Sequence, residues 1–228
     1  AELFLCDVSS MASIDEWVAD LKQKHPKIDV LINNAGVYYS SRVVTEDGFE
    51  KSFATNYIAP LLITEHLLDA VDGGRIIYTN SSFHRFARFD TDNLQAEKSL
   101  FPLRHYGTTK LLTLLFMREL TRRAADRDLF LAAYHPGIVG TRIAQQEWSW
   151  MGTISRIGTK FVRSPKTGAD TGIYLATSDD VLDRNGQYWF DRKLGKLRPD
   201  AKNDGYAKEL WSITEALLGR RIFPMLPQ

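Results

Sequence analysis

The sequence has a single cysteine, Cys6, among its 228 residues. One thiol cannot form an internal disulfide, and such low cysteine use fits a reducing compartment. No apolar run approaches the ~20 residues that a membrane-spanning helix needs. The first residues also lack the basic flank and the apolar length of a signal peptide. From these absences we predict an intracellular protein, either cytoplasmic or membrane-associated.

An excess of charge of one sign is also missing, because the net charge is +1. This balance gives no reason to expect nucleic acid or an acidic partner. The five histidines, at positions 25, 66, 84, 105 and 135, lack the spacing of metal ligands. Asp90 and Asp92 lie in a segment of mixed charge and are most simply surface residues. We therefore predict no metal site, and the absence of a G-x-S-x-G motif argues against a serine hydrolase.

The composition is that of a soluble globular protein, with 44% hydrophobic and 25% charged residues. Short apolar runs alternate with segments of helical periodicity, which favours an α/β fold with a parallel sheet and helices on both faces. The length suits one domain over residues 1–228. The expected strands are residues 3–5, 28–32, 75–79, 129–134 and 186–191. The expected helices are residues 13–24, with a capping box at Ser13, then 47–70, 106–123, 166–177 and one that Asn203 caps.

Tyr106 and Lys110 are the clearest candidate catalytic pair. Residues four apart on a helix share a face, with Cβ atoms about 5–6 Å apart. A phenol has an ordinary pKa of about 10, and a neighbouring ammonium group lowers it. We therefore expect Tyr106 to act as a general acid or base near neutral pH.

Other polar residues follow the expected strands at their carboxyl ends, where open α/β sheets bind ligands. The run Asn-Asn-Ala-Gly occupies residues 33–36, after the strand expected at 28–32. Ser82 lies just after the strand expected at 75–79. Gly36 would let the backbone approach a ligand closely. Taken alone, both segments could simply be turns, since Asn, Gly and Ser are common there. Asn56 lies in the apolar part of an expected helix and could serve only as a core hydrogen-bonding residue.

Together these segments resemble the short-chain dehydrogenase/reductase family. The matching elements are Asn-Asn-Ala-Gly at 33–36, Asn56, Ser82, Tyr106-x-x-x-Lys110 and Pro-Gly-Ile-Val-Gly-Thr at 136–141. Within the family, Asn-Leu-Gln-Ala-Glu-Lys at 93–98 is similar to the retinol-dehydrogenase-like branch. The five elements stand in the order and spacing of the family, and the resemblance covers nearly the whole chain.

The resemblance implies a Rossmann-like doubly wound sheet and an NAD(P)-dependent oxidoreductase. Hydride would pass between the nicotinamide and a carbonyl or alcohol substrate, expected to be lipophilic and retinoid-, steroid- or lipid-like. By resemblance, Tyr106 transfers the proton, Lys110 lowers the pKa of Tyr106 and bonds the ribose, and Ser82 orients the substrate oxygen. Asn56 would hold a water molecule in a proton relay to Lys110.

The resemblance also implies the cofactor contacts. The cofactor would be NADP or NAD, with NADP favoured, and the protein would form homodimers or tetramers. The implied cofactor-binding residues are Asp7, Val8, Asn33, Ala35, Gly36, Tyr106, Lys110, Pro136, Gly137, Ile138 and Thr141.

The first two βα units of the family, with their glycine-rich phosphate-binding turn, have no counterpart in the sequence. This absence keeps an alternative open: a non-catalytic or truncated relative with a regulatory or interaction role. A further open point is residues 145–162, where apolar residues recur at helical spacing. That segment could pack on the sheet, cover the substrate, or contact a membrane surface or another subunit.

Overall fold

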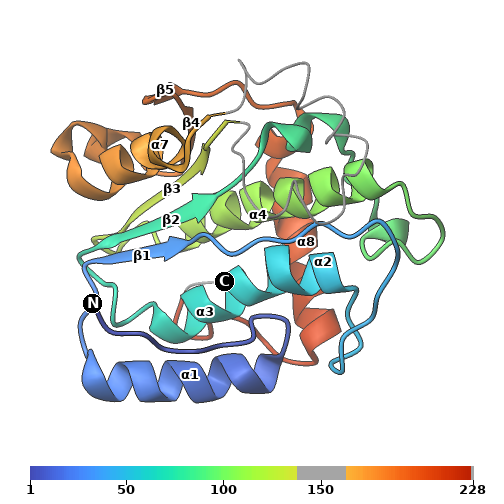
Figure 1. The fold of residues 1–228 in the computed structure, drawn as a ribbon, viewed down its shortest axis with the longest axis horizontal. Coiled ribbons are helices and arrows are strands. Elements are labelled where there is room, and N and C mark those ends of the chain that lie inside the picture. Colours follow the sequence, from blue (N-terminus) through green and yellow to red (C-terminus); the bar gives the residue numbers. More distant parts are fainter. Residues whose placement is uncertain (138–162, 227–228) are drawn as a thin grey trace.

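The computed structural model describes residues 1–137 and 163–226 (Figure 1). Its sheet has the strand order β1-β2-β3-β4-β5. The strands are β1 (Val30–Asn33), β2 (Arg75–Thr79), β3 (Phe130–His135), β4 (Gln187–Phe190) and β5 (Lys193–Leu194). β1 to β4 run parallel, and β5 pairs antiparallel with β4. The predicted α/β fold with a parallel sheet is therefore confirmed.

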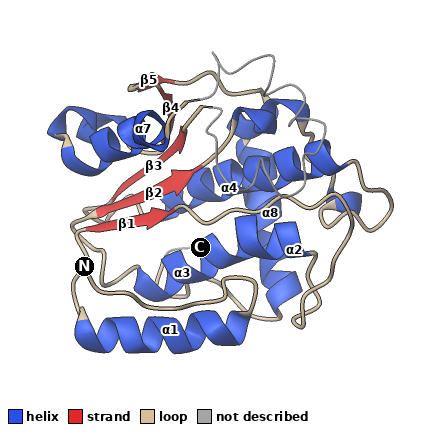
Figure 2. Ribbon diagram, viewed as in Figure 1, coloured by secondary structure: helices blue, strands red, loops and turns tan. Residues whose placement is uncertain are grey.

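Helices cover both faces of this sheet (Figure 2). They are α1 (Met11–Lys24), α2 (Lys51–Phe53), α3 (Ala59–Leu67), α4 (Pro102–Arg123), α7 (Pro165–Thr177) and α8 (Asp204–Leu218). Ile77 of β2 packs in the core beneath α7, whereas Ile76 and Tyr78 pack in the larger core beneath α1, α3, α4 and α8. Successive residues of β2 thus face opposite layers, as the period of two in a strand requires.

Side-chain caps mark the starts of α1 and α8. Ser10 accepts a hydrogen bond from the backbone N–H of Ser13, so α1 begins at Met11 and the predicted cap at Ser13 is wrong. Asn203 accepts from the backbone N–H of Tyr206 and begins α8, as predicted.

The helix predicted over residues 47–70 is present as one helical run over residues 51–67, and it contains a π-helical turn before Pro60. Glu50 caps α2 by accepting from the Phe53 N–H, and a π-helical turn, Ala54–Ile58, separates α2 from α3. Pro60 lies in the first turn of α3. Proline has no N–H and its ring crowds the carbonyl four residues earlier, which here belongs to Asn56. That carbonyl instead accepts from the Thr113 hydroxyl at 3.0 Å, so the wider turn frees Asn56 to bind α4.

The predicted strand at residues 3–5 is wrong. Within residues 1–137 and 163–226 they pair with no strand, and Leu3 and Leu5 are 84% and 86% exposed. A β-strand depends on ladder hydrogen bonds with a neighbour, so an apolar run alone does not make one.

The C-terminal segment packs back onto α3. Arg220 forms a bidentate ion pair with Glu65, and the Phe223 N–H donates to the same carboxylate at 2.7 Å. Ile222 and Phe223 are buried. The residues after α8, for which the sequence suggested no role, therefore close the larger core.

Two further sequence predictions concern the segment at 145–162 and membrane-spanning helices. The segment at 145–162 lies outside the described residues. Among the residues that the structure describes, none of the helices combines the length and apolar character needed to cross a membrane.

Candidate active site

The candidate site forms where the N-terminal half of α4 passes the carboxyl ends of β1 and β2. A 3₁₀ turn, Ser82–Phe86, follows β2 and packs directly on α4. Gly107 makes this contact possible, because a Cβ atom there would lie 2.4 Å from the Phe83 carbonyl oxygen. The missing side chain in the Tyr-Gly-Thr-Thr-Lys run thus brings the serines after β2 against Tyr106.

Tyr106 has Ser81 as the hydrogen-bond partner of its hydroxyl group. Burial raises the pKa of Tyr106 to about 12, and the Ser81 hydroxyl lowers it only in part. The expectation that Lys110 pulls this pKa toward neutrality is not met. The ammonium nitrogen lies 5.7 Å from the centre of the Tyr106 ring, and burial of the phenol dominates.

Lys110 is buried, with 4% of its surface exposed. Its Nζ donates to the backbone carbonyl of Thr79 at 3.2 Å. Burial lowers the pKa of Lys110 to about 8, because desolvation disfavours the ammonium form. The site therefore keeps a cation beside Tyr106 at neutral pH.

Asn56 is buried in the π-helical turn and is fully engaged. Its side-chain oxygen accepts from the Val37 N–H at 2.8 Å, and its Nδ2 donates to the Val37 carbonyl at 2.9 Å. Nδ2 also lies 3.0 Å from the Thr109 hydroxyl. These bonds match the core hydrogen-bonding interpretation, and they tie the loop after β1 to α4.

Gly36 lies against both of these residues. A Cβ atom at Gly36 would stand 3.4 Å from Asn56 Oδ1 and 3.4 Å from Lys110 Nζ. The backbone thus approaches the catalytic candidates without a side chain between them. A glycine backbone beside a cation suits close approach of the ribose and nicotinamide end of a dinucleotide.

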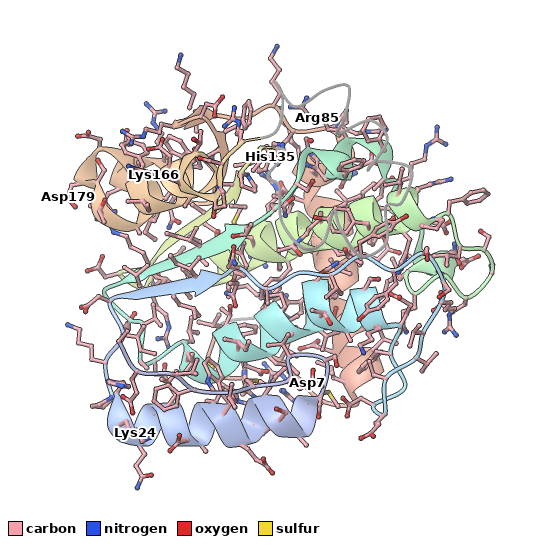
Figure 3. The ribbon with its side chains drawn as sticks, in the orientation of Figure 1. Asp7, Lys24, Arg85, His135, Lys166 and Asp179 are labelled. Atoms are coloured by element: carbon pink, nitrogen blue, oxygen red, sulfur yellow. The ribbon has the colours of Figure 1, made fainter. Side chains whose placement is uncertain are left out.

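The other predicted cofactor-binding residues lie in several places. Asn33 ends β1 and donates to the Thr64 hydroxyl at 3.3 Å, and Ala35 is exposed in the loop that follows. Asp7 stands at the start of α1, where Figure 3 labels it, and its carboxylate accepts from both the N–H and the hydroxyl of Ser9. The neighbouring Val8 is half-buried against the core.

The remaining predicted cofactor contacts follow β3. Pro136 and Gly137 leave the end of this strand, and Gly137 has a φ of +82°. A residue with a side chain is disfavoured there. Ile138 and Thr141 lie outside the described residues.

Sequence reasoning missed two residues of this site. Asn80 is buried, donates to the Lys110 carbonyl at 3.0 Å and accepts from the Ser81 N–H at 2.7 Å. It therefore ties the end of β2 to α4 and holds the Ser81 backbone, whose side chain interacts with Tyr106. The predicted role of Ser82 stays a prediction. The polar run Asn80-Ser81-Ser82 was the only signal, and it did not say which serine faces the tyrosine.

Metal ligands are not gathered in this region. Within residues 1–137 and 163–226, no three or more His, Cys, Asp or Glu side chains lie together as a metal-binding group would require.

Comparisons with known proteins agree with this geometry. The profile described as short chain dehydrogenase matches residues 1–152. Mouse retinol dehydrogenase 14 is 34% identical over 221 residues, which cover 93% of this chain and 66% of the relative. The protein named daunorubicin C-13 ketoreductase DnrU from Streptomyces sp. strain C5 is 32% identical, covering 96% of this chain and 75% of the relative. The chain thus spans about two thirds to three quarters of the length of these relatives.

Solved structures show the same fold. A crystal structure of an uncharacterized protein from Mycobacterium paratuberculosis superposes with a TM-score of 0.77 at 26% identity, covering 97% of this chain and 76% of that one. The angucycline C-6 ketoreductase LanV, crystallised with NADP, gives a TM-score of 0.60 at 25% identity, covering 80% of this chain and 70% of its own. On the profile match, these relatives and the Rossmann-like sheet, the chain belongs to the short-chain dehydrogenase/reductase family, in its retinol-dehydrogenase-like branch.

Proposed function

We propose that this protein is an NAD(P)-dependent oxidoreductase that interconverts a carbonyl compound and the corresponding alcohol. The observation that carries the proposal is the convergence of Tyr106, Ser81 and Lys110 at the carboxyl ends of the strands. To reduce a carbonyl group, an enzyme must polarise its oxygen and protonate it. A proton donor, a second hydroxyl and a buried cation gathered at one place can do both.

The cofactor would be held by backbone and side chains on three sides. Gly36 would allow close approach of the dinucleotide, Lys110 would offer its ammonium group to the ribose, and Pro136 and Gly137, at the end of β3, would contact the nicotinamide. The bound nicotinamide supplies or accepts the hydride. NADP is the preferred form in this proposal, supported by LanV, which was crystallised with NADP.

Tyr106 is the acid in the reducing direction. With its pKa raised to about 12, the phenol keeps its proton at neutral pH and can donate it to the carbonyl oxygen as negative charge develops there. Lys110, still mostly cationic at neutral pH, stabilises the phenolate that remains. Asn56 positions α4 through Thr109 and Val37; its part in a water relay stays a prediction.

The substrate we propose is a lipophilic carbonyl or alcohol. The support is by analogy, since the relatives are named as a retinol dehydrogenase and as a ketoreductase of daunorubicin. We further propose that the whole chain forms a single NAD(P)-binding domain. Assembly into dimers or tetramers and contact with a membrane surface stay predictions.

The two serines give a direct test of the proposal. Ser81 contacts the Tyr106 hydroxyl, so Ser81→Ala should lower kcat for NADPH-dependent ketone reduction by roughly 10²-fold, as loss of one positioned donor does. Ser82→Ala, the matched control, should change kcat by less than about threefold. Steady-state kinetics of both variants measures this. A large loss of kcat in Ser82→Ala and a small one in Ser81→Ala would assign the substrate-orienting role to Ser82. Wild-type kcat in both variants would contradict the proposed site.

A further inference from the structure

Four aromatic rings stand in a row through the candidate site. Tyr38 meets Tyr106 edge to face, with ring centroids 6.2 Å apart and planes at 73°. Phe83 also meets Tyr106 edge to face, with ring centroids 6.0 Å apart and planes at 71°. Phe86 continues the row beyond Phe83 at 5.8 Å. The proposed proton donor is therefore the second ring of a row of four, which we call the ring row.

The ring row is built from the two segments that carry the site. Tyr38 lies two positions after Gly36 in the loop that follows β1. Phe83 and Phe86 belong to the 3₁₀ turn Ser82–Phe86, directly after Ser81. Figure 3 labels Arg85 of this turn in the upper part of the view, and both Arg85 and Phe86 are exposed, so the turn reaches the surface. The row thus runs from beside the reacting hydroxyl to solvent.

Exposure separates the ring row from ordinary core packing. In the core pair Phe53 and Tyr57, by comparison, the residues are 0% and 1% exposed. Phe86 is 68% exposed, although a phenyl ring in water forgoes about 25 cal/mol for each Å² left unburied. An exposed phenyl at the end of an ordered row offers a face to which a ligand ring can bind.

The ring row is also held in place before any ligand arrives. The Phe83 carbonyl lies against Gly107 so closely that no side chain fits between them. The Phe83 and Tyr38 rings are each fixed at a steep angle to the Tyr106 ring. Rings whose planes are fixed discriminate between ligand shapes better than flexible aliphatic side chains do, because stacking and edge contacts depend on geometry.

We infer that the ring row is a specificity element that selects substrates whose carbonyl or carbinol carbon is attached to a planar aromatic ring. The inference deepens the proposed function and rests on it. A flat ring can stack on Phe86 or meet Phe83 edge to face while its carbonyl oxygen reaches Tyr106 and Ser81. A saturated ring of the same size lacks the flat face and the quadrupole that such contacts need. Each good aromatic contact is worth on the order of a 2–10-fold preference beyond the area it buries.

The test compares acetophenone with cyclohexyl methyl ketone, which share one carbon skeleton but differ in the flatness of the ring. The measured quantity is the ratio of kcat/KM for the two ketones with NADPH. Comparing this ratio between each variant and the wild type cancels the intrinsic difference in reactivity between the ketones. Phe86→Leu keeps an apolar side chain but removes the ring face, and it should lower the ratio about 3–10-fold relative to the wild type.

Phe101→Leu is the matched control. Phe101 precedes α4, is 63% exposed and stands outside the ring row, so its loss should leave the ratio unchanged. A ratio that is unaffected by Phe86→Leu, or that Phe101→Leu lowers equally, would overturn the inference. A wild-type preference for the saturated ketone that Phe86→Leu does not alter would point to an aliphatic substrate and overturn it as well.

A binding measurement separates failure of the inference from failure of the proposed function. Calorimetric titration of 2-naphthol and of decahydro-2-naphthol needs no turnover. If neither ketone is reduced but naphthol binds more tightly and Phe86→Leu removes the difference, the ring row recognises aromatic ligands and the proposed catalysis is wrong. If the ketones are reduced while the naphthol preference is absent, catalysis stands and the inference fails.

Discussion

Replacing Tyr106 with phenylalanine should lower kcat for ketone reduction by at least ~10²–10⁴-fold, the usual contribution of a positioned acid. The variant loses a single hydroxyl group. Its ring can still pack between Tyr38 and Phe83, so the fold and the NADPH affinity should stay close to those of the wild type. The hydroxyl is the group with which Ser81 interacts, and it is the group that the proposal assigns as the proton donor.

The measurement is steady-state kinetics together with a fluorescence titration of NADPH on the same preparation. Tyr39→Phe is the control, because Tyr39 is a neighbouring half-buried tyrosine whose ring lies under Lys51 rather than in the site. It should retain wild-type turnover. If Tyr106→Phe retained turnover, Tyr106 could not be the acid; if it lost NADPH binding as well, the loss of activity would say nothing about proton transfer.

Replacing Glu50 with alanine should lower the free energy of unfolding by about 3 kcal/mol, the cost of removing one partner from a buried polar pair. Glu50 and His105 are 2.6 Å apart, with side chains 1% and 5% exposed. Glu50 also accepts from the Ser52 hydroxyl and the Phe53 N–H, so its loss leaves three donors unpaired inside the protein. Because His105 precedes Tyr106 on α4, this pair also anchors the helix that carries the proposed acid.

Urea unfolding of wild type, Glu50→Ala and the control Glu46→Ala checks this expectation. Glu46 is exposed and its removal should change stability by less than ~0.5 kcal/mol. Equal stability of Glu50→Ala and the wild type at neutral pH would show that the pair contributes nothing.

The contribution of Glu50 should also depend on pH in a defined direction. Burial raises the pKa of the Glu50 carboxyl, but the hydrogen bonds from His105, Ser52 and Phe53 outweigh it and hold the pKa below its ordinary value. A carboxyl with a depressed folded-state pKa contributes stability that is full above its unfolded pKa of about 4.3. That contribution is lost as the pH falls through the folded-state value. The stability difference between wild type and Glu50→Ala should therefore shrink in acid.

Periodicity and strand-end chemistry predicted most of the fold. β2, β3 and α4 are long, apolar on the side that packs and bounded by clear breaking residues, so their positions followed from the pattern alone. The segment at residues 3–5 shows the limit of this reasoning, because a short apolar run becomes a strand only when another strand pairs with it. The helix at 47–70 contains a π-helical turn before Pro60, and the contact of Thr113 with the Asn56 carbonyl in that turn is a tertiary one that local sequence does not encode.

The sequence predicted which residue types form the candidate site. It did not predict which of the two serines faces Tyr106 or how buried the tyrosine is. Tyr106 and Lys110 share a helix face at i and i+4, which spacing alone determines. The choice between Ser81 and Ser82 depended on Asn80, whose bonds to Lys110 and Ser81 appear only in three dimensions. The pKa of Tyr106 likewise depended on burial, a tertiary property that raised the value where a charge argument alone lowered it.

Binding of the cofactor is the step on which every proposed catalytic role depends. The most direct test is a fluorescence titration of NADPH, and separately of NADH, against the purified protein and its Lys110→Met variant. We expect saturable binding by the wild type, tighter for NADPH than for NADH, and at least ~10-fold weaker binding once the buried ammonium beside Gly36 is removed. A folded wild-type protein that binds neither dinucleotide would contradict the proposed oxidoreductase and leave a non-catalytic member of the family in its place.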